Sequence, residues 1–67
     1  MFSYDLLWKL LIDRKMTKSE LREAVGFSTF TLAQMGKNKN VSMDTIDKIC
    51  SYLDVPIEQV IKHIKEV

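Results

Sequence analysis

Residues 17–35, TKSELREAVGFSTFTLAQM, encode two short helices joined by a tight turn, and the rest of the chain is organised around this pair. Thr17 and Glu20 have the spacing of a capping box, in which hydroxyl and carboxylate each bind a free backbone N–H group at a helix start. Gly26 stands where a chain leaves a helix through a left-handed conformation that a Cβ disfavours. Ser28 has the side chain to cap the second helix. The stretch therefore predicts helices over residues 18–25 and 29–36.

Three more helices are predicted around this pair. The first covers residues 3–15, with Ser3 as its cap. The fourth covers 43–53 after Ser42, and the last covers 56–66, because proline suits the first turn of a helix. Helical spacing assigns to the core Leu7, Leu10 and Leu11, then Leu21, Ala24 and Val25, then Leu32 and Met35, then Ile46, Ile49, Cys50 and Leu53, and finally Ile57, Val60, Ile61 and Ile64. The expected fold class is all-α, a single compact domain of five helices over residues 1–67.

Length and composition narrow the class of protein. A chain of 67 residues buries roughly 60% of its unfolded surface, which supports one small core and no deep cleft for a small-molecule ligand. The single cysteine, Cys50, excludes an intrachain disulfide. No apolar run is long enough to span a membrane, and no basic and apolar leader opens the chain, so we expect a cytoplasmic protein.

The residues do not assemble a catalytic or metal site. The only histidine, His63, is expected in the last turn of the final helix, where a cation complements the helix dipole. Cys50 falls on an apolar helical stripe and is expected to act as a small core residue. Asp44 and Asp47 lie at a helix start, where negative charge is favourable. We therefore expect no enzyme, no metal and no cofactor.

Positive charge is concentrated around the helix pair. Residues 14–40 hold six basic and two acidic residues, whereas the rest of the chain holds four lysines and seven acidic residues. A net charge of +1 hides this segregation. The positive part of the chain suits an anionic polymer, although lysines also solvate ordinary surfaces.

The second helix of the pair has an outer face suited to the major groove of double-stranded DNA. Small or amide side chains can meet base edges and thymine methyl groups there, while neighbouring donors bind phosphates. Two fates are equally open for Phe30: contact with thymine methyls, or burial. The candidate base contacts are Thr29, Phe30, Thr31, Ala33 and Gln34, and the candidate phosphate contacts are Thr17, Lys18, Ser28, Lys37, Lys39 and Asn40.

A second apolar stripe runs along the first helix through Tyr4, Trp8 and Ile12, spaced four residues apart. The C-terminal helix can cover this stripe, or a second subunit can do so. With Leu11 beside it, the stripe is the candidate face for a homodimer.

The order of these features resembles the Cro/lambda-repressor-type helix-turn-helix family, often called the Xre family. The resemblance runs from about Leu7 to Ile64 and rests on the segment MTKSELREAVGFSTFTLAQM, a Lys/Asn-rich loop, the segment VSMDTIDKICSYLDV and a short final helix. It implies a lambda-repressor-like five-helix domain that binds operator DNA, usually as a dimer on a two-fold-related site. By position, the family's phosphate contacts fall on Lys18 and the loop from Lys37 to Asn40, and its base contacts on Thr29, Phe30 and Gln34.

The chain also departs from the family pattern. Thr29 and Phe30 replace a polar pair, so the base preference of relatives does not transfer. Gly36 replaces an acidic residue, Asn38 a glycine, and Leu11 a frequent arginine.

Two hypotheses from different classes follow. The first is a sequence-specific DNA-binding transcriptional regulator, a repressor. The alternative is a protein-interaction module, an antitoxin or adaptor, that keeps the fold without reading DNA and binds its partner through Phe30 and the stripe at Trp8.

Overall fold

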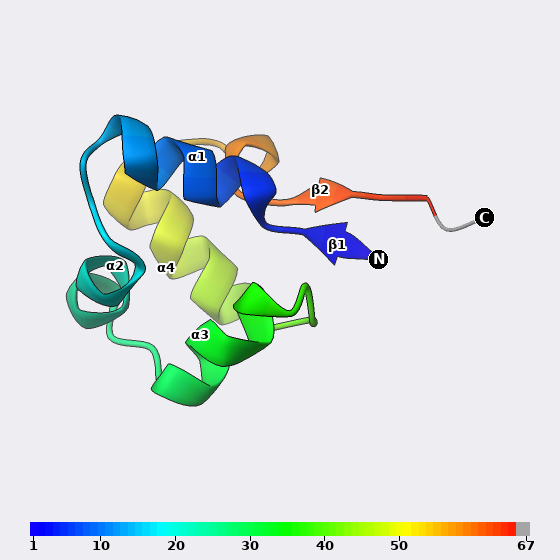
Figure 1. Cartoon of the computed structure of the whole chain (residues 1–67), viewed down its shortest axis with the longest axis horizontal. Helices are drawn as coiled ribbons and strands as arrows, with labels where there is room; N and C mark the ends of the chain where they lie inside the picture. The colour runs from blue at the N-terminus through cyan, green and yellow to red at the C-terminus, as the bar shows by residue number, and fades with distance from the viewer. Residues whose placement is uncertain (66–67) are drawn as a thin grey trace.

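The structure is a computed structural model and describes residues 1–65. Two short strands and four α-helices make up this part of the chain, together with one 3-10 turn (Figure 1). In chain order they are β1 (Phe2–Ser3), α1 (Asp5–Asp13), α2 (Lys18–Val25), α3 (Thr29–Gly36), α4 (Met43–Leu53), the 3-10 turn η1 (Ile57–Gln59) and β2 (Lys62–His63).

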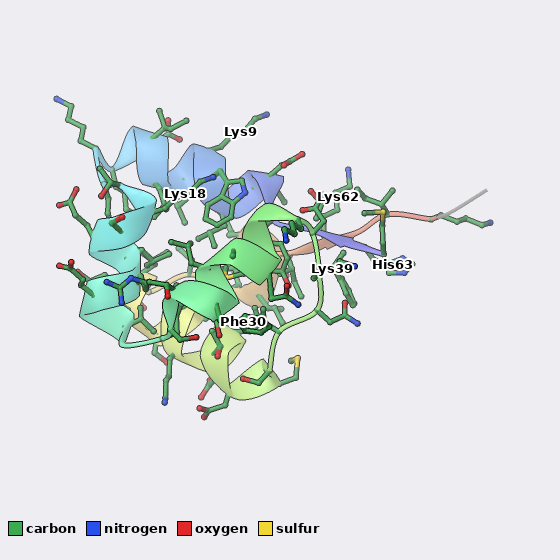
Figure 2. All side chains as sticks on the ribbon, turned by 60° about the horizontal axis from the view of Figure 1, so that its bottom comes forward. Lys9, Lys18, Phe30, Lys39, Lys62 and His63 are labelled. Carbon is green, nitrogen blue, oxygen red and sulfur yellow. The ribbon has the colours of Figure 1, made fainter. Side chains whose placement is uncertain are left out.

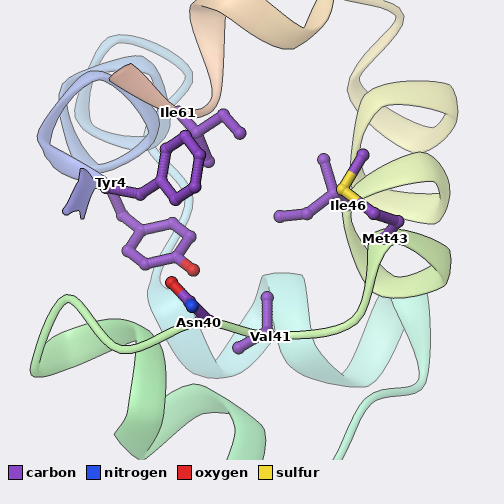
Figure 3. Close-up of a pocket in the computed structure, with 7 residues that line it drawn as sticks. Tyr4, Asn40, Val41, Met43, Ile46 and Ile61 are labelled. Atoms are coloured by element: carbon purple, nitrogen blue, oxygen red, sulfur yellow. The ribbon is translucent and has the colours of Figure 1, made fainter. Parts of the chain in front are cut away.

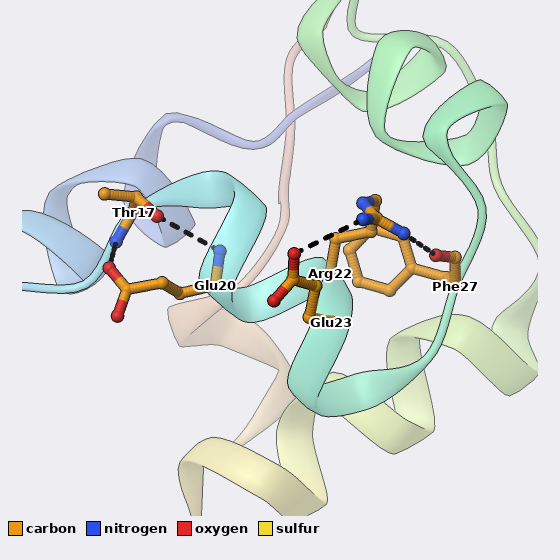
Figure 4. Close-up of polar contacts among 5 residues, drawn as sticks. All are labelled: Thr17, Glu20, Arg22, Glu23 and Phe27. Carbon is orange, nitrogen blue, oxygen red and sulfur yellow. Dashed lines mark hydrogen bonds and ion pairs between the residues drawn. The ribbon is translucent and has the colours of Figure 1, made fainter.

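The helix pair α2–α3 forms with the predicted bounds. Thr17 Oγ1 accepts the Glu20 N–H at 3.1 Å and Glu20 Oε1 accepts the Thr17 N–H at 3.0 Å, so the capping box is confirmed (Figure 4). Gly26 ends α2 with φ +92°, in the left-handed region. Ser28 Oγ accepts the Thr31 N–H at 3.1 Å and caps α3. Local capping chemistry therefore marks where both helices begin and where α2 ends.

The core lies between α1, α2, α4 and η1, and α3 packs on α2 at one side of it. Phe27, in the turn between α2 and α3, is buried and ties the turn to this core. Ala24 is exposed instead of inward, and Val25 and Leu32 are half-buried at the margin. The buried apolar residues are Tyr4, Leu7, Leu11, Leu21, Phe27, Met35, Ile46, Ile49, Leu53 and Val60.

The predicted fifth helix, residues 56–66, is wrong over the described residues. Pro56 is extended with ψ 161°, and η1 makes a single turn before the chain straightens into β2. β2 pairs antiparallel with β1, Phe2 opposite His63 and Ser3 opposite Lys62. The strand forms because β1 offers free backbone groups to a segment rich in β-branched residues, which favour extended backbone.

This change also reassigns the apolar residues of the C-terminal segment. Val60 is fully buried and Ile61 half-buried, as expected. Ile57 and Ile64 are about two-fifths exposed, however, at 41% and 40%, so they are not core residues. Residue 66, the predicted helix end, lies outside the described residues.

The first helix begins at Asp5, two residues later than predicted. Ser3 is therefore a strand residue, not the N-cap, which is Tyr4. The hydroxyl of Ser3 still serves the helix start, because its Oγ accepts the Asp5 N–H at 3.2 Å. The predicted end at residue 15 is also too late, since α1 ends at Asp13 and Lys15 turns the chain with φ 56°.

The second stripe on α1 does not form one face. Tyr4 and Leu11 are each only 2% exposed within the single chain, so they cannot contact a second subunit. Trp8 is half-buried against the core, and Ile12 is 73% exposed. The candidate dimer face is therefore corrected to Ile12 and the accessible part of Trp8.

None of the helices within residues 1–65 is long and apolar enough to cross a membrane.

Candidate nucleic-acid interface

Helix α3 presents an outer face with no large charged group on it. Thr29, Phe30 and Ala33 are exposed, and Thr31 and Gln34 are half-buried. Phe30 is 71% exposed, so of the two alternatives, surface contact or burial, burial is excluded. Thr31 is expected to face outward only in part, and its Oγ1 accepts a hydrogen bond from the capping hydroxyl of Ser28 at 3.0 Å.

The loop after α3 is held by backbone bonds at the helix end. The Gln34 carbonyl accepts N–H groups from Lys37 and Lys39 at 3.1 and 2.9 Å, and the Met35 carbonyl accepts the Asn38 N–H at 3.1 Å. Asn38 takes a left-handed conformation, with φ 55°, which asparagine tolerates better than most residues. The side chains of Lys37, Lys39 and Asn40 are exposed on this loop, so all three are accessible to phosphates.

Tyr4, near the N-terminus, binds the same loop through two hydrogen bonds. Its backbone N–H donates to Asn38 Oδ1 at 3.3 Å, and its hydroxyl donates to the Lys39 carbonyl at 2.8 Å. Burial raises the pKa of Tyr4, and a backbone hydrogen bond from Val41 partly opposes this shift. Sequence reasoning placed Tyr4 on an apolar stripe and missed this polar role, which no local pattern signals.

Lys18 defines the flank of the interface opposite the loop. Lys18 and Lys39 lie on either side of α3, with Phe30 on α3 itself (Figure 2). The Lys18 Nζ stands 4.2 Å from the centroid of the Trp8 ring. Thr17 and Ser28, also predicted as phosphate contacts, are exposed at the starts of α2 and α3, where backbone N–H groups remain available to anions.

Arg22, which was counted among the basic residues of the helix pair, supports the turn. Its Nη1 donates to the Phe27 carbonyl at 3.5 Å, and its Nη2 lies 3.7 Å from Glu23 Oε1 (Figure 4). The guanidinium therefore satisfies a turn carbonyl and belongs to the support of the interface.

The residues with reactive side chains lie apart from one another. His63 is in β2, not in a last helical turn, and packs edge-on against Phe2 with ring centroids 5.3 Å apart. Cys50 is half-buried against the core, as expected, and burial together with the charge of Asp47 raises its pKa. Within residues 1–65, no three His, Cys, Asp or Glu side chains are grouped to hold a metal ion.

A shallow apolar hollow of about 230 Å³ lies between the strands and the start of α4 (Figure 3). Tyr4 and Ile61 line one side, Met43 and Ile46 the other, and the loop at Val41 passes between them. The sequence did not predict this hollow, because its walls come from three separate segments.

Two comparisons with known proteins agree with this geometry. The sequence profile described as "Cro/C1-type HTH DNA-binding domain" matches residues 6–66. A solved structure described as "Crystal structure of transcriptional regulator VanUg, Form II" superimposes with a TM-score of 0.94 and 52% sequence identity, over 97% of this chain and 87% of that chain. A comparison with curated proteins found no match.

Proposed function

We propose, from the premise that this chain belongs to the Cro/C1-type helix-turn-helix DNA-binding family, that it is a sequence-specific transcriptional regulator which reads the major groove with α3. The observation that carries the proposal is the exposed outer face of α3 between two lysine-bearing flanks. The transcriptional regulator of similar structure, 52% identical, supports the regulatory part. Binding alone accounts for this activity, and we propose no catalytic step.

The base contacts are assigned to the exposed face of α3. Phe30 and the methyl group of Thr29 suit thymine methyls, and Ala33 lets a base edge approach closely. The amide of Gln34 suits adenine. Because Thr31 Oγ1 accepts the Ser28 hydroxyl, Thr31 contributes its methyl group and the hydrogen of its own hydroxyl as a donor.

The phosphate contacts are assigned to the two flanks. Lys18, with Thr17 and the N–H groups at the start of α2, binds one backbone strand. Lys37, Lys39 and Asn40 bind the other, and the α3 start at Ser28 adds further donors. These contacts fix the register in which α3 enters the groove.

Fluorescence anisotropy with a labelled mixed-sequence duplex at several salt concentrations tests this assignment. We expect a log–log slope of about −3 to −9, which corresponds to roughly four to ten neutralised phosphates. Lys37→Gln and Lys39→Gln should each reduce the slope by about 0.9. Lys9→Gln is the matched control, because Lys9 points away from α3 in Figure 2 and carries the same charge. Absence of binding at low salt would refute the proposal.

Repression is the proposed mode of regulation, because occupying a promoter requires nothing beyond DNA binding. Selection from a random duplex library would identify the operator. A reporter gene that carries this operator at its promoter should then be expressed less when the protein is present, and increased expression would show activation instead.

We further propose that two copies form a homodimer on DNA and not in free solution. A stable interface buries about 800 Å² on each partner, and Ile12 with part of Trp8 offers little of that area. Analytical ultracentrifugation should show a monomer without DNA and two copies on a duplex with two half-sites. A dimer in the absence of DNA would contradict this assembly.

One observation favours the second candidate function, a protein-interaction module. Phe30 is a large apolar side chain on an open face, as a protein contact requires. The two functions differ in their dependence on charge. Lys18→Gln with Lys37→Gln should weaken DNA binding at every sequence, whereas a protein partner held by Phe30 should be almost unaffected.

A further inference from the structure

Trp8 lies on α1 and its ring faces the first residue of α2. Its indole is half-buried and packs against the core, tilted by 41° to the Tyr4 ring with centroids 6.4 Å apart. The Nζ of Lys18, the first residue of α2, stands 4.2 Å from the centroid of the Trp8 ring. This separation is within the range over which an aromatic face attracts a cation. The exposed Lys18 side chain therefore has a defined direction.

The contact with Trp8 leaves the charge of Lys18 available. Within residues 1–65, Lys18 forms no ion pair with a carboxylate. The carboxylate of Glu20, on the same helical turn, is bonded to the Thr17 N–H at 3.0 Å. An indole attracts an ammonium group without neutralising it, whereas a carboxylate in its place would cancel the charge.

We propose that Trp8 is a positioning residue for DNA binding, whose ring holds the Lys18 ammonium beside the start of α2 for contact with a phosphate. The inference rests on the proposed function and adds a residue to its machinery. A free lysine side chain loses rotamer freedom when a phosphate fixes it. Trp8 removes part of that cost, because the side chain is already ordered before DNA arrives.

Trp8 lies next to Tyr4, the residue that holds the other flank of the candidate interface. Its ring packs on Tyr4, and the Tyr4 hydroxyl binds the Lys39 carbonyl at 2.8 Å. Tyr4 therefore holds the loop flank through its own hydrogen bond, and Trp8 holds the Lys18 flank.

A double-mutant cycle tests whether Trp8 acts through Lys18. Binding to a labelled mixed-sequence duplex too short for two copies, which excludes the proposed dimer contact, is measured for wild type, Trp8→Leu, Lys18→Gln and the double variant, with circular dichroism to verify the fold. We expect Trp8→Leu to weaken binding about twofold to fivefold, and Trp8→Phe to retain most of it, because a ring face remains. In the Lys18→Gln background, Trp8→Leu should have no further effect. An equal loss in both backgrounds would refute the proposal, since Trp8 would then act independently of Lys18.

A second measurement does not depend on changing Trp8. The chain has one tryptophan, so tryptophan fluorescence reports on Trp8 alone. Lys18→Gln should alter the emission of the free protein, whereas Lys9→Gln, on the exposed side of α1, should not. Identical emission from wild type and Lys18→Gln would mean that the contact between Lys18 and the Trp8 ring is absent in solution, and the proposal would be refuted.

The proposed function and the role of Trp8 can be refuted separately. A wild-type protein that does not bind the duplex at low salt overturns the proposed function, and the role of Trp8 with it. A wild-type protein that binds with the expected salt slope, but shows no coupling between Trp8 and Lys18, overturns the role of Trp8 alone.

Discussion

Gly26 illustrates how a single backbone angle determines the helix pair. Its φ of +92° lies in the left-handed region, and a Cβ built on it would meet no atom within 4 Å. The need for glycine is therefore conformational and not steric. Gly36, at the end of α3, also has open space around it but does not have a left-handed φ.

This difference predicts opposite effects for the same substitution. Gly26→Ala should destabilise the protein by about 1 kcal/mol, and Gly26→Val by more, because an L side chain disfavours left-handed backbone. Gly36→Ala should stabilise it by roughly 0.5 kcal/mol, because alanine is the better helix former. Urea denaturation measures both, and equal effects would contradict the turn assignment.

Tyr4 predicts a dependence of stability on alkaline pH. Burial raises the pKa of Tyr4 above its ordinary value of 10.0, so the folded state favours the neutral phenol. Its contribution to stability is complete below pH 10.0 and is lost as the pH rises through the folded-state pKa. Wild type should therefore lose more stability than Tyr4→Phe between about pH 8 and about pH 11.

Denaturation by urea at several pH values measures this difference. At neutral pH, Tyr4→Phe should itself cost about 1 kcal/mol, because the Lys39 carbonyl loses its hydrogen bond. If both proteins lost the same stability at alkaline pH, the phenol would not be buried as the structure has it.

At the scale of elements, the C-terminal segment does not adopt the helix that its local sequence pattern predicts. Apolar residues at positions 57, 60, 61 and 64 have helical spacing, yet the chain makes one 3-10 turn and then pairs with β1. Mutual backbone hydrogen bonds between Met1 and Ile64, at 2.7 and 3.0 Å, extend this pairing. The segment forms a strand instead of a helix because β1, at the other end of the chain, is available to pair with it.

Replacing either of two apolar side chains by alanine distinguishes the observed segment from the predicted helix. Val60→Ala should cost about 2 kcal/mol, because Val60 is fully buried. Ile57→Ala should change stability by less than about 0.5 kcal/mol, because Ile57 is 41% exposed. An amphipathic helix would bury both residues, so comparable losses in urea denaturation would favour the helix.

At the scale of the whole molecule, the proposed recognition face of α3 lies apart from the core that stabilises the fold. The core holds α1, α2 and α4 together, while the outer face of α3 contributes little to it. Phe30 is the clearest case, because its large ring is 71% exposed and its neighbours on α3 are small. Changes on this face can therefore alter binding without unfolding the domain.

Phe30→Gln tests this separation directly. Its unfolding free energy should stay within about 0.5 kcal/mol of wild type, whereas Leu32→Ala, which removes a side chain packed on the core, should be clearly destabilising. Duplexes selected from a random library should differ between Phe30→Gln and wild type at the contacted position. The same selected sequence for both proteins would remove Phe30 from the base contacts.

Short-range signals were sufficient for α2, α3 and α4. The capping hydroxyls at positions 17, 28 and 42 and the left-handed turns at Gly26 and Asn38 act within a few residues, so the sequence reveals them directly. The exposed lysines and the outward residues of α3 follow from the same helix bounds. The family resemblance is confirmed by the profile match over residues 6–66.

Long-range pairing decided the rest. β1 meets β2 across about sixty residues, and Tyr4 reaches the loop 34 and 35 positions away. These contacts bind Tyr4 of the expected dimer face to the loop and replace a helix by a strand. Local patterns could not predict them, because the free energy of a backbone pair or a buried hydroxyl depends on which distant segment the folded chain places beside it.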